Sequence, residues 1–440
     1  MNRMTNFLVT LGLVLSIITL SCKKDIEADN KTALSSRHDD GSAQDMLSNE
    51  VIIEWNNVAF KAAGGAAEAN PLLASRINAM MHIAIHDALN AIVPVYEQYA
   101  YHHKAQGDSA NPFAAAISAA HTVLKASWPD GASMLDATLD ASLSKIPEGP
   151  GKTQGIALGI GSGKAILALR AGDGAFQNPI ANVPVSTVPG VYNAVPPFDY
   201  MLAPFWKSMQ TFSLQKHDQF RSSPRPALNS NIYTRDFNEV KRMGEMNSTL
   251  RTADQSAYAK WWYEYSDIGW NRIARVKSTN SNLGLYTTAR MFALLNMAMA
   301  DGYIAGWDSK FYYYSWRPYT AIHEAATDGN DQTGADRNWE PLMPTPPVPD
   351  YPSTHSVLGN AAAKVLIHFF KDKSAFSMTS TTAFPAGAVR SFESFTQAAN
   401  ENANARVMAG IHFRFACEAG QTLGDKVGKW TLDNHLKPLH

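Results

Sequence analysis

Hydrophobic residues recur at intervals of three and four along most of the chain after Val51, which is the spacing of one helical face. The pattern predicts helices over the approximate ranges 45–63, 70–93, 111–128, 150–171, 251–265, 284–306, 354–371, 387–409 and 412–430. Several segments, such as ARMFALLNMAMADGYIAGW, are hydrophobic on nearly all sides, so we expect them to be buried among other helices. Strand-like alternation is scarce. We therefore predict an all-α fold, a helical bundle with long ordered loops.

Two proline-rich stretches interrupt the helical pattern. Residues 178–206 separate an N-terminal helical layer, about 49–177, from a bundle that covers about 207–432. The second stretch, PLMPTPPVPDYP, leads into the helix predicted from residue 354. Since both parts have the same helical pattern and no internal repeat stands out, we treat residues 49–440 as one helical domain.

The first 22 residues differ from the rest of the chain. MNRMTNFLVTLGLVLSIITLSC has one arginine, a short apolar run, small residues and then Cys22, which is typical of a secretory signal and too short for a membrane span. TLSCKKD resembles a bacterial lipoprotein signal, although Thr19 stands where leucine is usual. We expect a lipid anchor on Cys22, a flexible polar tether over residues 23–48, and a location in the periplasm or at the outer cell surface. A plainly secreted protein is the alternative.

Composition narrows the function classes. The formal net charge of −1 leaves no basic excess to neutralise phosphates, so we do not expect nucleic-acid binding. Hydrophobic residues make up 45% of the chain and charged residues 18%, which is enough for a globular core. Apart from Cys22 the sequence has only Cys417, so the core must hold the fold without an intrachain disulfide.

A cluster of polar residues, YPSTHS, stands directly before the apolar run of the helix predicted over 354–371. Ser353 is a good helix N-cap, and Pro352 keeps the preceding coil from continuing into the helix. A helix start also binds anions readily, and His355 at that place can exchange protons. By itself the stretch is more typical of a capped helix start than of a catalytic site.

Two further segments carry cations and a second histidine. In WDSKFYYYSWRP, Lys310 and Arg317 are seven residues apart, which on one helix places them about 20° from a common face. In ARVMAGIHFRFACEAG, Arg406 and His412 are six residues apart, about 120° from each other on an unbroken helix. For both to reach one site, the helix must end near Gly410 and restart beside His412.

Taken together, these segments resemble a known signature. Lys310-x6-Arg317-Pro318, Pro352-Ser353-Thr354-His355 and Arg406-x5-His412 are similar to the motifs of the superfamily that unites vanadium-dependent haloperoxidases, type 2 phosphatidic acid phosphatases and bacterial acid phosphatases. The flanking segments RTADQSAYAKWW, WNRIARV and NWEPLMPTPPVPDYPSTHS look like those of secreted bacterial haloperoxidases. The resemblance extends over most of residues 50–430.

The resemblance implies a vanadate cofactor and a role for each motif residue. His412 would be the metal ligand, and His355 would be the catalytic group that exchanges protons. Trp307, three residues before Lys310, would line the wall beside the halide. The residues that would bind the oxygens of the cofactor are Lys310, Arg317, Ser353, Thr354 through its backbone N–H, and Arg406.

The resemblance also implies an activity. A vanadate-dependent haloperoxidase oxidises a halide, here expected to be iodide or bromide, with hydrogen peroxide to hypohalous acid, and phosphate competes with vanadate. The motifs leave an acid phosphatase open, in which His412 forms a phosphohistidine and His355 protonates the leaving alcohol. A non-catalytic surface lipoprotein is the third hypothesis. The sequence does not reveal the oligomeric state.

Two positions depart from the family pattern. Glycine usually stands between the serine and the histidine, but here the residue is Thr354, whose branched side chain restricts the backbone. Many members have an aspartate four residues after the second histidine, where it orients the ring, but here the residue is Ala416. We expect Glu418 or a backbone carbonyl to substitute for the missing aspartate.

Another pair of histidines suggests a metal site of a different kind. His82 and His86 are four residues apart on one helical face, which suits zinc. No glutamate lies between them and no third ligand is evident, so we predict that both are core histidines with hydrogen-bond partners.

Overall fold

The computed structural model describes residues 46–64, 70–103 and 109–439, all of which belong to one compact unit, residues 44–440. The signal segment 1–22 and nearly all of the tether 23–48 lie outside these residues, so the lipid anchor remains a prediction. None of the helices in the described ranges is long and apolar enough to cross a membrane.

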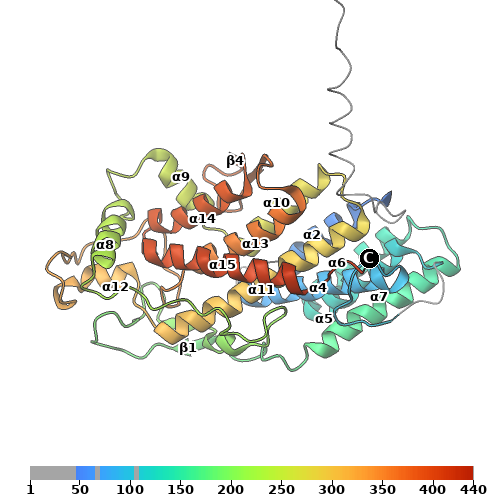
Figure 1. The fold of residues 1–440 in the computed structure, drawn as a ribbon, viewed down its shortest axis with the longest axis horizontal. Helices are drawn as coiled ribbons and strands as arrows, with labels where there is room; N and C mark the ends of the chain where they lie inside the picture. The colour runs from blue at the N-terminus through green and yellow to red at the C-terminus, as the bar shows by residue number, and fades with distance from the viewer. Residues whose placement is uncertain (1–45, 65–69, 104–108, 440) are drawn as a thin grey trace, which may run out of the picture. The chain divides into compact units, whose positions relative to one another are not determined.

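The fold is helical, which confirms the predicted all-α class (Figure 1). Its strands form two short antiparallel pairs, β1 (Ile180–Asn182) with β2 (Tyr200–Leu202) and β3 (Phe376–Thr379) with β4 (Val389–Phe392). The α-helices of the described residues are α2 (Glu50–Ala63), α4 (Pro71–Ile92), α5 (Pro112–Ser127), α6 (Ala132–Leu143), α7 (Pro150–Leu169), α8 (Asn231–Met243), α9 (Ala253–Trp261), α10 (Ser266–Thr279), α11 (Leu285–Tyr313), α12 (Pro318–His323), α13 (Thr354–Phe370), α14 (Phe395–Met408) and α15 (Arg414–Asn434).

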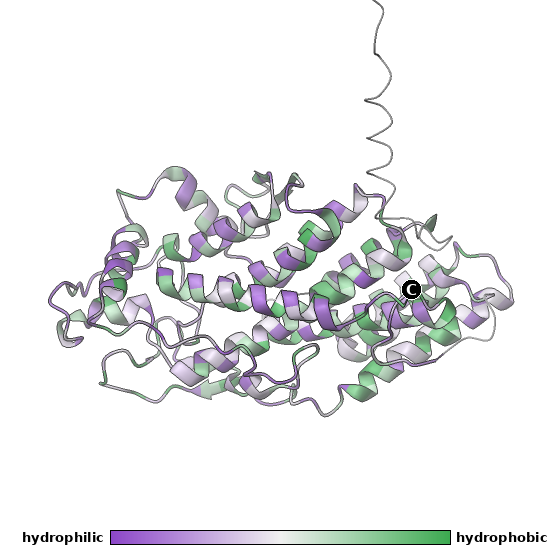
Figure 2. Ribbon diagram, viewed as in Figure 1, coloured by the Kyte–Doolittle hydropathy of each residue, from purple (hydrophilic) through white to green (hydrophobic). Residues whose placement is uncertain are grey.

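Some predicted boundaries are wrong, and four helices were not predicted: α6, α8, α10 and α12. Helix α8 buries only four of its residues, on one face, and is otherwise hydrophilic, so the segment has too few apolar residues to stand out from the loops around it (Figure 2). The helix predicted over 251–265 ends at Trp261, because the chain turns before the extended residue Tyr265 begins α10. The helix predicted over 387–409 begins only at Phe395, since residues before it form β4.

The most hydrophobic predicted helices are indeed the most buried. Every residue of α4 apart from Leu73 is buried, and so is α11 from Leu285 to Lys310 apart from Thr287. Helix α11 packs against α4, α13 and α15. A helix that must be covered on all sides explains why its sequence lacks a polar face.

The paired histidines of α4 are core residues, as predicted. His82 Nε2 lies 2.8 Å from Asn56 Nδ2 and its ring stacks on Phe292, while His86 Nε2 lies 3.0 Å from the Glu97 carbonyl oxygen. Burial lowers the pKa of His82 to about 3 and that of His86 to about 4, so both rings are neutral near pH 7. The described residues contain no group of three or more histidine, cysteine or carboxylate side chains that would hold a metal ion.

Helices α13 and α15 lie in direct backbone contact, which positions the candidate site. A Cβ atom at Gly420 would lie 2.4 Å from the Ser353 carbonyl oxygen, and one at Gly424 would lie 2.2 Å from the Val357 carbonyl oxygen. Only glycine permits this approach. The first turn of α13 therefore lies against the second and third turns of α15, and Figure 1 shows the two helices side by side.

Candidate functional site

The start of α13 presents two hydroxyl groups without protein partners. Ser353 is the N-cap residue, as predicted, with φ −70° and ψ 114°, but its side chain makes no capping hydrogen bond. Ser353 Oγ and Thr354 Oγ1 are buried and have no hydrogen-bond partner in the described part of the chain. A buried hydroxyl without a partner is costly, so a ligand at this helix N-terminus is the natural acceptor or donor for both groups.

Lys310 and Arg317 do not share a helix, so that expectation is wrong. Helix α11 contains Lys310 but ends at Tyr313, and Tyr314 has left-handed backbone angles of φ 48° and ψ 45°. Arg317 is extended, with φ −88° and ψ 160°, because the residue before a proline disfavours the helical conformation. The chain thus turns between the two cations.

The two cations nevertheless reach the same segment. Lys310 Nζ donates to the carbonyl oxygens of Pro349, at 2.7 Å, and Asp350, at 2.9 Å. Arg317 Nε donates to the Val348 carbonyl oxygen at 2.7 Å. Both cations are 1% exposed. The proline-rich segment before α13 is therefore tied to the two side chains that the motifs single out.

Arg406 and His412 are separated by a break in the helix, as predicted. Helix α14 ends before Gly410, which has φ +80°, and α15 begins at Arg414. A side chain at position 410 would be strained by this left-handed backbone. His412 therefore lies in the short connection between the two helices, directly before the first turn of α15.

The ring of His412 contacts a carboxylate and a guanidinium group, which also lie near each other, with 3.9 Å between Asp350 Oδ1 and Arg317 Nη1. Its Nδ1 is 2.7 Å from Asp350 Oδ1, and its Nε2 is 3.0 Å from Arg317 Nη1. Burial lowers the pKa of His412 well below the usual 6.5, and the charges of Arg317, Lys310 and Arg406 lower it further. The imidazole is consequently neutral and can act as a nitrogen ligand.

The partner of His412 is not the one that we expected. Ala416 is buried and its carbonyl oxygen accepts a hydrogen bond from the Ser353 N–H, while Glu418 is exposed. The carboxylate comes instead from Asp350, the acid within PLMPTPPVPDYP. Sequence reasoning missed it because the contact joins two distant segments. Burial raises the pKa of Asp350 to about 7, against the opposite effect of Arg317 and Lys310.

Buried positive charge exceeds buried negative charge around His412. Lys310, Arg317 and Arg406 are each 1% exposed. Burial lowers the pKa of Lys310, and the charges of Arg317 and Arg406 lower it further. Burial lowers the pKa of Arg406 to about 10, and its Nε has no hydrogen-bond partner among the described residues. Of the carboxylates, Asp350 lies directly against His412. Three buried cations with one such carboxylate fit an anion with several oxygens, so the donor set suits vanadate.

His355 is the more exposed of the two motif histidines. Its Nε2 lies 3.0 Å from the Glu264 carbonyl oxygen, which can only accept a hydrogen bond, so Nε2 carries the proton and Nδ1 has the lone pair. Desolvation lowers the pKa of His355 well below 6.5, and Arg406 lowers it further. This histidine is a neutral base that retains access to solvent.

Trp307 lies one turn before Lys310 on α11. It is 4% exposed, its Nε1 donates to the Leu202 carbonyl oxygen at 3.3 Å, and its ring meets Tyr303 edge to face. The side chain is therefore held rigidly near the cations. Its place beside a halide stays a prediction.

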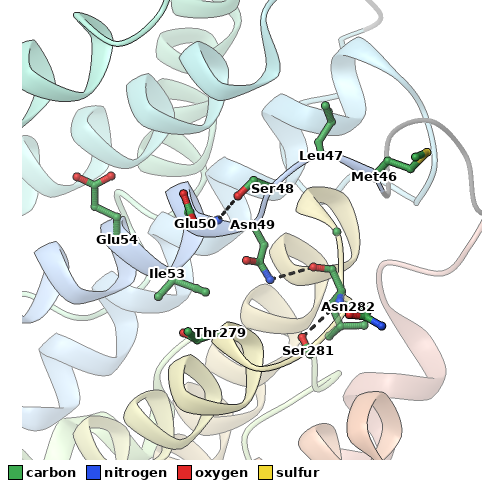
Figure 3. Close-up of a pocket in the computed structure, with 12 residues that line it drawn as sticks. Met46, Leu47, Ser48, Asn49, Glu50, Ile53, Glu54, Thr279, Ser281 and Asn282 are labelled. Atoms are coloured by element: carbon green, nitrogen blue, oxygen red, sulfur yellow. Dashed lines mark hydrogen bonds between the residues drawn. The ribbon is translucent and has the colours of Figure 1, made fainter.

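A separate pocket of about 540 Å³ lies at the start of α2 (Figure 3). It is lined by residues 46–50, 53 and 54 together with Thr279 and residues 281–284, and Asn49 Nδ2 donates to the Leu283 carbonyl oxygen at 2.9 Å. None of the predicted site residues contributes to this pocket. We therefore assign the candidate chemistry to the cations and histidines around α13.

Comparison with known proteins shows similarity to one group of enzymes. A family model described as the VCPO second helical-bundle domain matches residues 290–440. The vanadium chloroperoxidase of Curvularia inaequalis is 27% identical over an alignment that includes 52% of this chain and 48% of that protein. The chain thus spans about half the length of this relative.

Solved structures extend the similarity to nearly the whole chain. The first bacterial vanadium-dependent iodoperoxidase to be solved superposes with a TM-score of 0.76 and 25% identity, over 90% of this chain and 99% of that one. The holo form of a bacterial vanadium-dependent chloroperoxidase gives a TM-score of 0.66 at 16% identity, over 82% of this chain and 91% of that one. These similarities confirm the helical fold that the motifs implied.

Proposed function

We propose that this chain, which shares the fold and the signature residues of the vanadium haloperoxidases, is a vanadate-dependent haloperoxidase that oxidises iodide or bromide with hydrogen peroxide to hypohalous acid. The observation that carries the proposal is the set of three buried cations around a neutral, buried His412. The likeness to an iodoperoxidase over 99% of that chain supports iodide as a substrate.

Each group would hold the oxyanion in a different way. Lys310, Arg317 and Arg406 would balance its negative charge, and the arginine forks can each donate to two oxygens. Ser353 Oγ and the N–H groups at the start of α13 would complete the set of donors. His412 Nε2 would serve as the nitrogen ligand. Bound vanadate supplies a Lewis acid that activates peroxide without a change of oxidation state.

His355 would move the proton that the reaction requires. Its Nδ1 lone pair is available because Nε2–H is bound to the Glu264 carbonyl oxygen. The ring can therefore take a proton at Nδ1 when peroxide binds and return it later to the product. Its partial exposure provides a route for that proton to exchange with water.

The decisive experiment compares two activities of one preparation. The vanadate-reconstituted protein is assayed for peroxide-dependent oxidation of iodide and bromide, and the vanadate-free protein for hydrolysis of a phosphate ester. We expect halide oxidation that phosphate inhibits by competition with vanadate. Ester hydrolysis without halide oxidation would identify a phosphatase instead. A protein with neither activity would be the non-catalytic alternative.

Removal of a single cation should weaken vanadate binding measurably. We expect Lys310→Met and Arg406→Met each to cost about 1.5–3 kcal/mol, the range for hydrogen bonds to charged groups. Equilibrium dialysis against vanadate measures the loss, with thermal unfolding as the check that each variant folds.

A matched control for these variants is Arg290→Met. Arg290 is a buried cation on α11, as Lys310 is, but the two residues are about 30 Å apart along the helix axis. Arg290 Nε donates to the Leu436 carbonyl oxygen at 2.6 Å. Its loss should leave vanadate affinity unchanged. Affinity that is equally indifferent to all three substitutions would mean that the cations do not converge on the anion.

We also propose that a lipid on Cys22 anchors the protein in the periplasm or at the outer cell surface, on the support of the TLSCKKD segment. Cys22→Ser should then give a soluble protein with unchanged activity, measured after membranes are separated by centrifugation. Retention of the Cys22→Ser protein on membranes after a high-salt wash would contradict the anchor.

A further inference from the structure

His412 is the residue whose ring orientation matters most for the proposed function, and it has a partner that the family motif does not supply. Asp350 Oδ1 lies 2.7 Å from His412 Nδ1, and both side chains are almost completely buried. We infer that Asp350 is the positioning residue of the site, which orients the His412 ring and keeps the proton on Nδ1 so that Nε2 is the ligand. The inference rests on the proposed function, since it assigns a role toward vanadate.

The hydrogen-bonding capacities of the two neighbours favour one tautomer. The charges of Arg317 and Lys310 favour the ionised form of Asp350, and an ionised carboxylate can only accept a hydrogen bond, so the 2.7 Å contact with Oδ1 favours a proton on His412 Nδ1. A guanidinium can only donate, and Arg317 Nη1 lies 3.0 Å from Nε2 and 3.4 Å from Nδ1, so the shorter contact favours a lone pair on Nε2. Both contacts thus favour the tautomer with its lone pair on Nε2 before any anion binds.

The backbone of Asp350 is fixed independently of its side chain. Its N–H donates to the Ser315 carbonyl oxygen at 2.9 Å, and its carbonyl oxygen accepts from Lys310 Nζ at 2.9 Å. The neighbouring carbonyl of Pro349 also accepts from Lys310. A carboxylate on such a rigid segment can define the angle of a ring precisely, and its removal leaves the backbone contacts in place.

The position expected to carry the orienting carboxylate cannot do so in this chain. Ala416 has no polar side-chain atom, and its carbonyl oxygen is occupied by the Ser353 N–H. Asp308 is the other buried carboxylate near Lys310 in sequence, but it pairs with Arg221 at 2.7 Å and with His217 at 3.1 Å. Asp350 is therefore the carboxylate that contacts His412, and Asp308 provides a matched control.

The first test needs no vanadate. Protein labelled with ¹⁵N-histidine is measured by NMR in the anion-free state, and the His412 signals are assigned with His412→Gln. The wild type should show a protonated Nδ1 and an unprotonated Nε2. Asp350→Ala should lose this preference, whereas Asp350→Asn, which keeps an acceptor oxygen, should retain it. If the wild-type protein has the His412 proton on Nε2, the inference is wrong, whatever the variants show.

The second test separates the histidine from the cations. Vanadate would be bound by His412 and by the cations, whereas phosphate would be bound by the cations and hydroxyl groups without a bond to nitrogen. Asp350→Ala should therefore lower vanadate affinity about 10- to 100-fold, the usual effect of removing the partner of a ligating histidine, and should change phosphate affinity much less. Asp308→Ala should leave the affinity for vanadate and the His412 tautomer unchanged.

These outcomes distinguish the inference from the proposed function. If the wild type binds neither anion, the proposed function fails. If the wild type binds vanadate and oxidises halide, but Asp350→Ala keeps its tautomer and affinity, only the role of Asp350 is wrong. An equal loss of vanadate and phosphate affinity would show that Asp350 acts on the cations and not on the histidine ring.

Discussion

Replacement of His412 with alanine is expected to abolish stable vanadate binding and haloperoxidase activity together. The metal needs a nitrogen donor, and His412 is the buried imidazole that lies against Arg317 and is kept neutral by burial and by the surrounding cations. The three cations would still attract an oxyanion, so weak, rapidly exchanging binding of vanadate or phosphate should persist. Titration with vanadate followed by ⁵¹V NMR distinguishes a tightly bound cofactor from this exchanging population.

The control for this variant is His323→Ala on α12. His323 is partly buried, its Nε2 donates to the Trp339 carbonyl oxygen at 2.8 Å, and its ring packs against Tyr319. It should keep wild-type affinity and rate. If His412→Ala binds vanadate as tightly as the wild type and stays active, another side chain is the ligand and the assignment of the site is wrong.

The helical fold was predictable because its information is local. Buried helices such as α4 and α11 have nearly continuous apolar sequences, and packing requires that pattern wherever a helix is covered on all sides. The same reasoning fails for α8, which buries one narrow face and is hydrophilic elsewhere. The periodicity also failed to predict that one helix ends at Trp261 and that α10 begins at Ser266. No proline or glycine lies between these residues to indicate the change of direction.

The parts of the candidate site that depend on spacing within one short segment could be examined from the sequence, with mixed success. The break at Gly410 followed from the six-residue spacing of Arg406 and His412, since an unbroken helix would point them apart. The spacing of Lys310 and Arg317 misled, because left-handed Tyr314 and the residue before Pro318 end the helix between them.

Contacts between distant segments were beyond the reach of the sequence. The pairing of Asp350 with His412 requires that the segments directly before α13 and α15 come together, as the hydrogen bond from the Ser353 N–H to the Ala416 carbonyl oxygen also shows. Gly420 and Gly424 make that approach possible, and their four-residue spacing on one helical face was visible in the sequence as a signal of close packing. The spacing did not reveal that α13 would pack against these glycines. It therefore did not reveal that Asp350, just before α13, would reach His412.

Replacement of His355 with alanine should separate binding from catalysis. The side chain is bound to the Glu264 carbonyl oxygen and contributes no cation near pH 7, because desolvation and Arg406 hold its pKa well below 6.5. Vanadate affinity should therefore remain close to that of the wild type. Activity should fall about 10²- to 10⁴-fold, the usual contribution of acid–base catalysis, and the pH profile should lose the limb that this group produces.

The control for His355 is His368→Ala at the far end of the same helix, where the ring packs against Phe369 and no cation of the site is near. It should preserve rate, affinity and pH profile, so that any loss in the first variant reflects the group beside the anion and not the stability of α13. Binding and steady-state rates measured on both variants decide the roles. If His355→Ala loses vanadate while His412→Ala keeps it, the roles of the two histidines are the reverse of those proposed. Asp350 would then orient a histidine that moves protons, and not one that binds the metal.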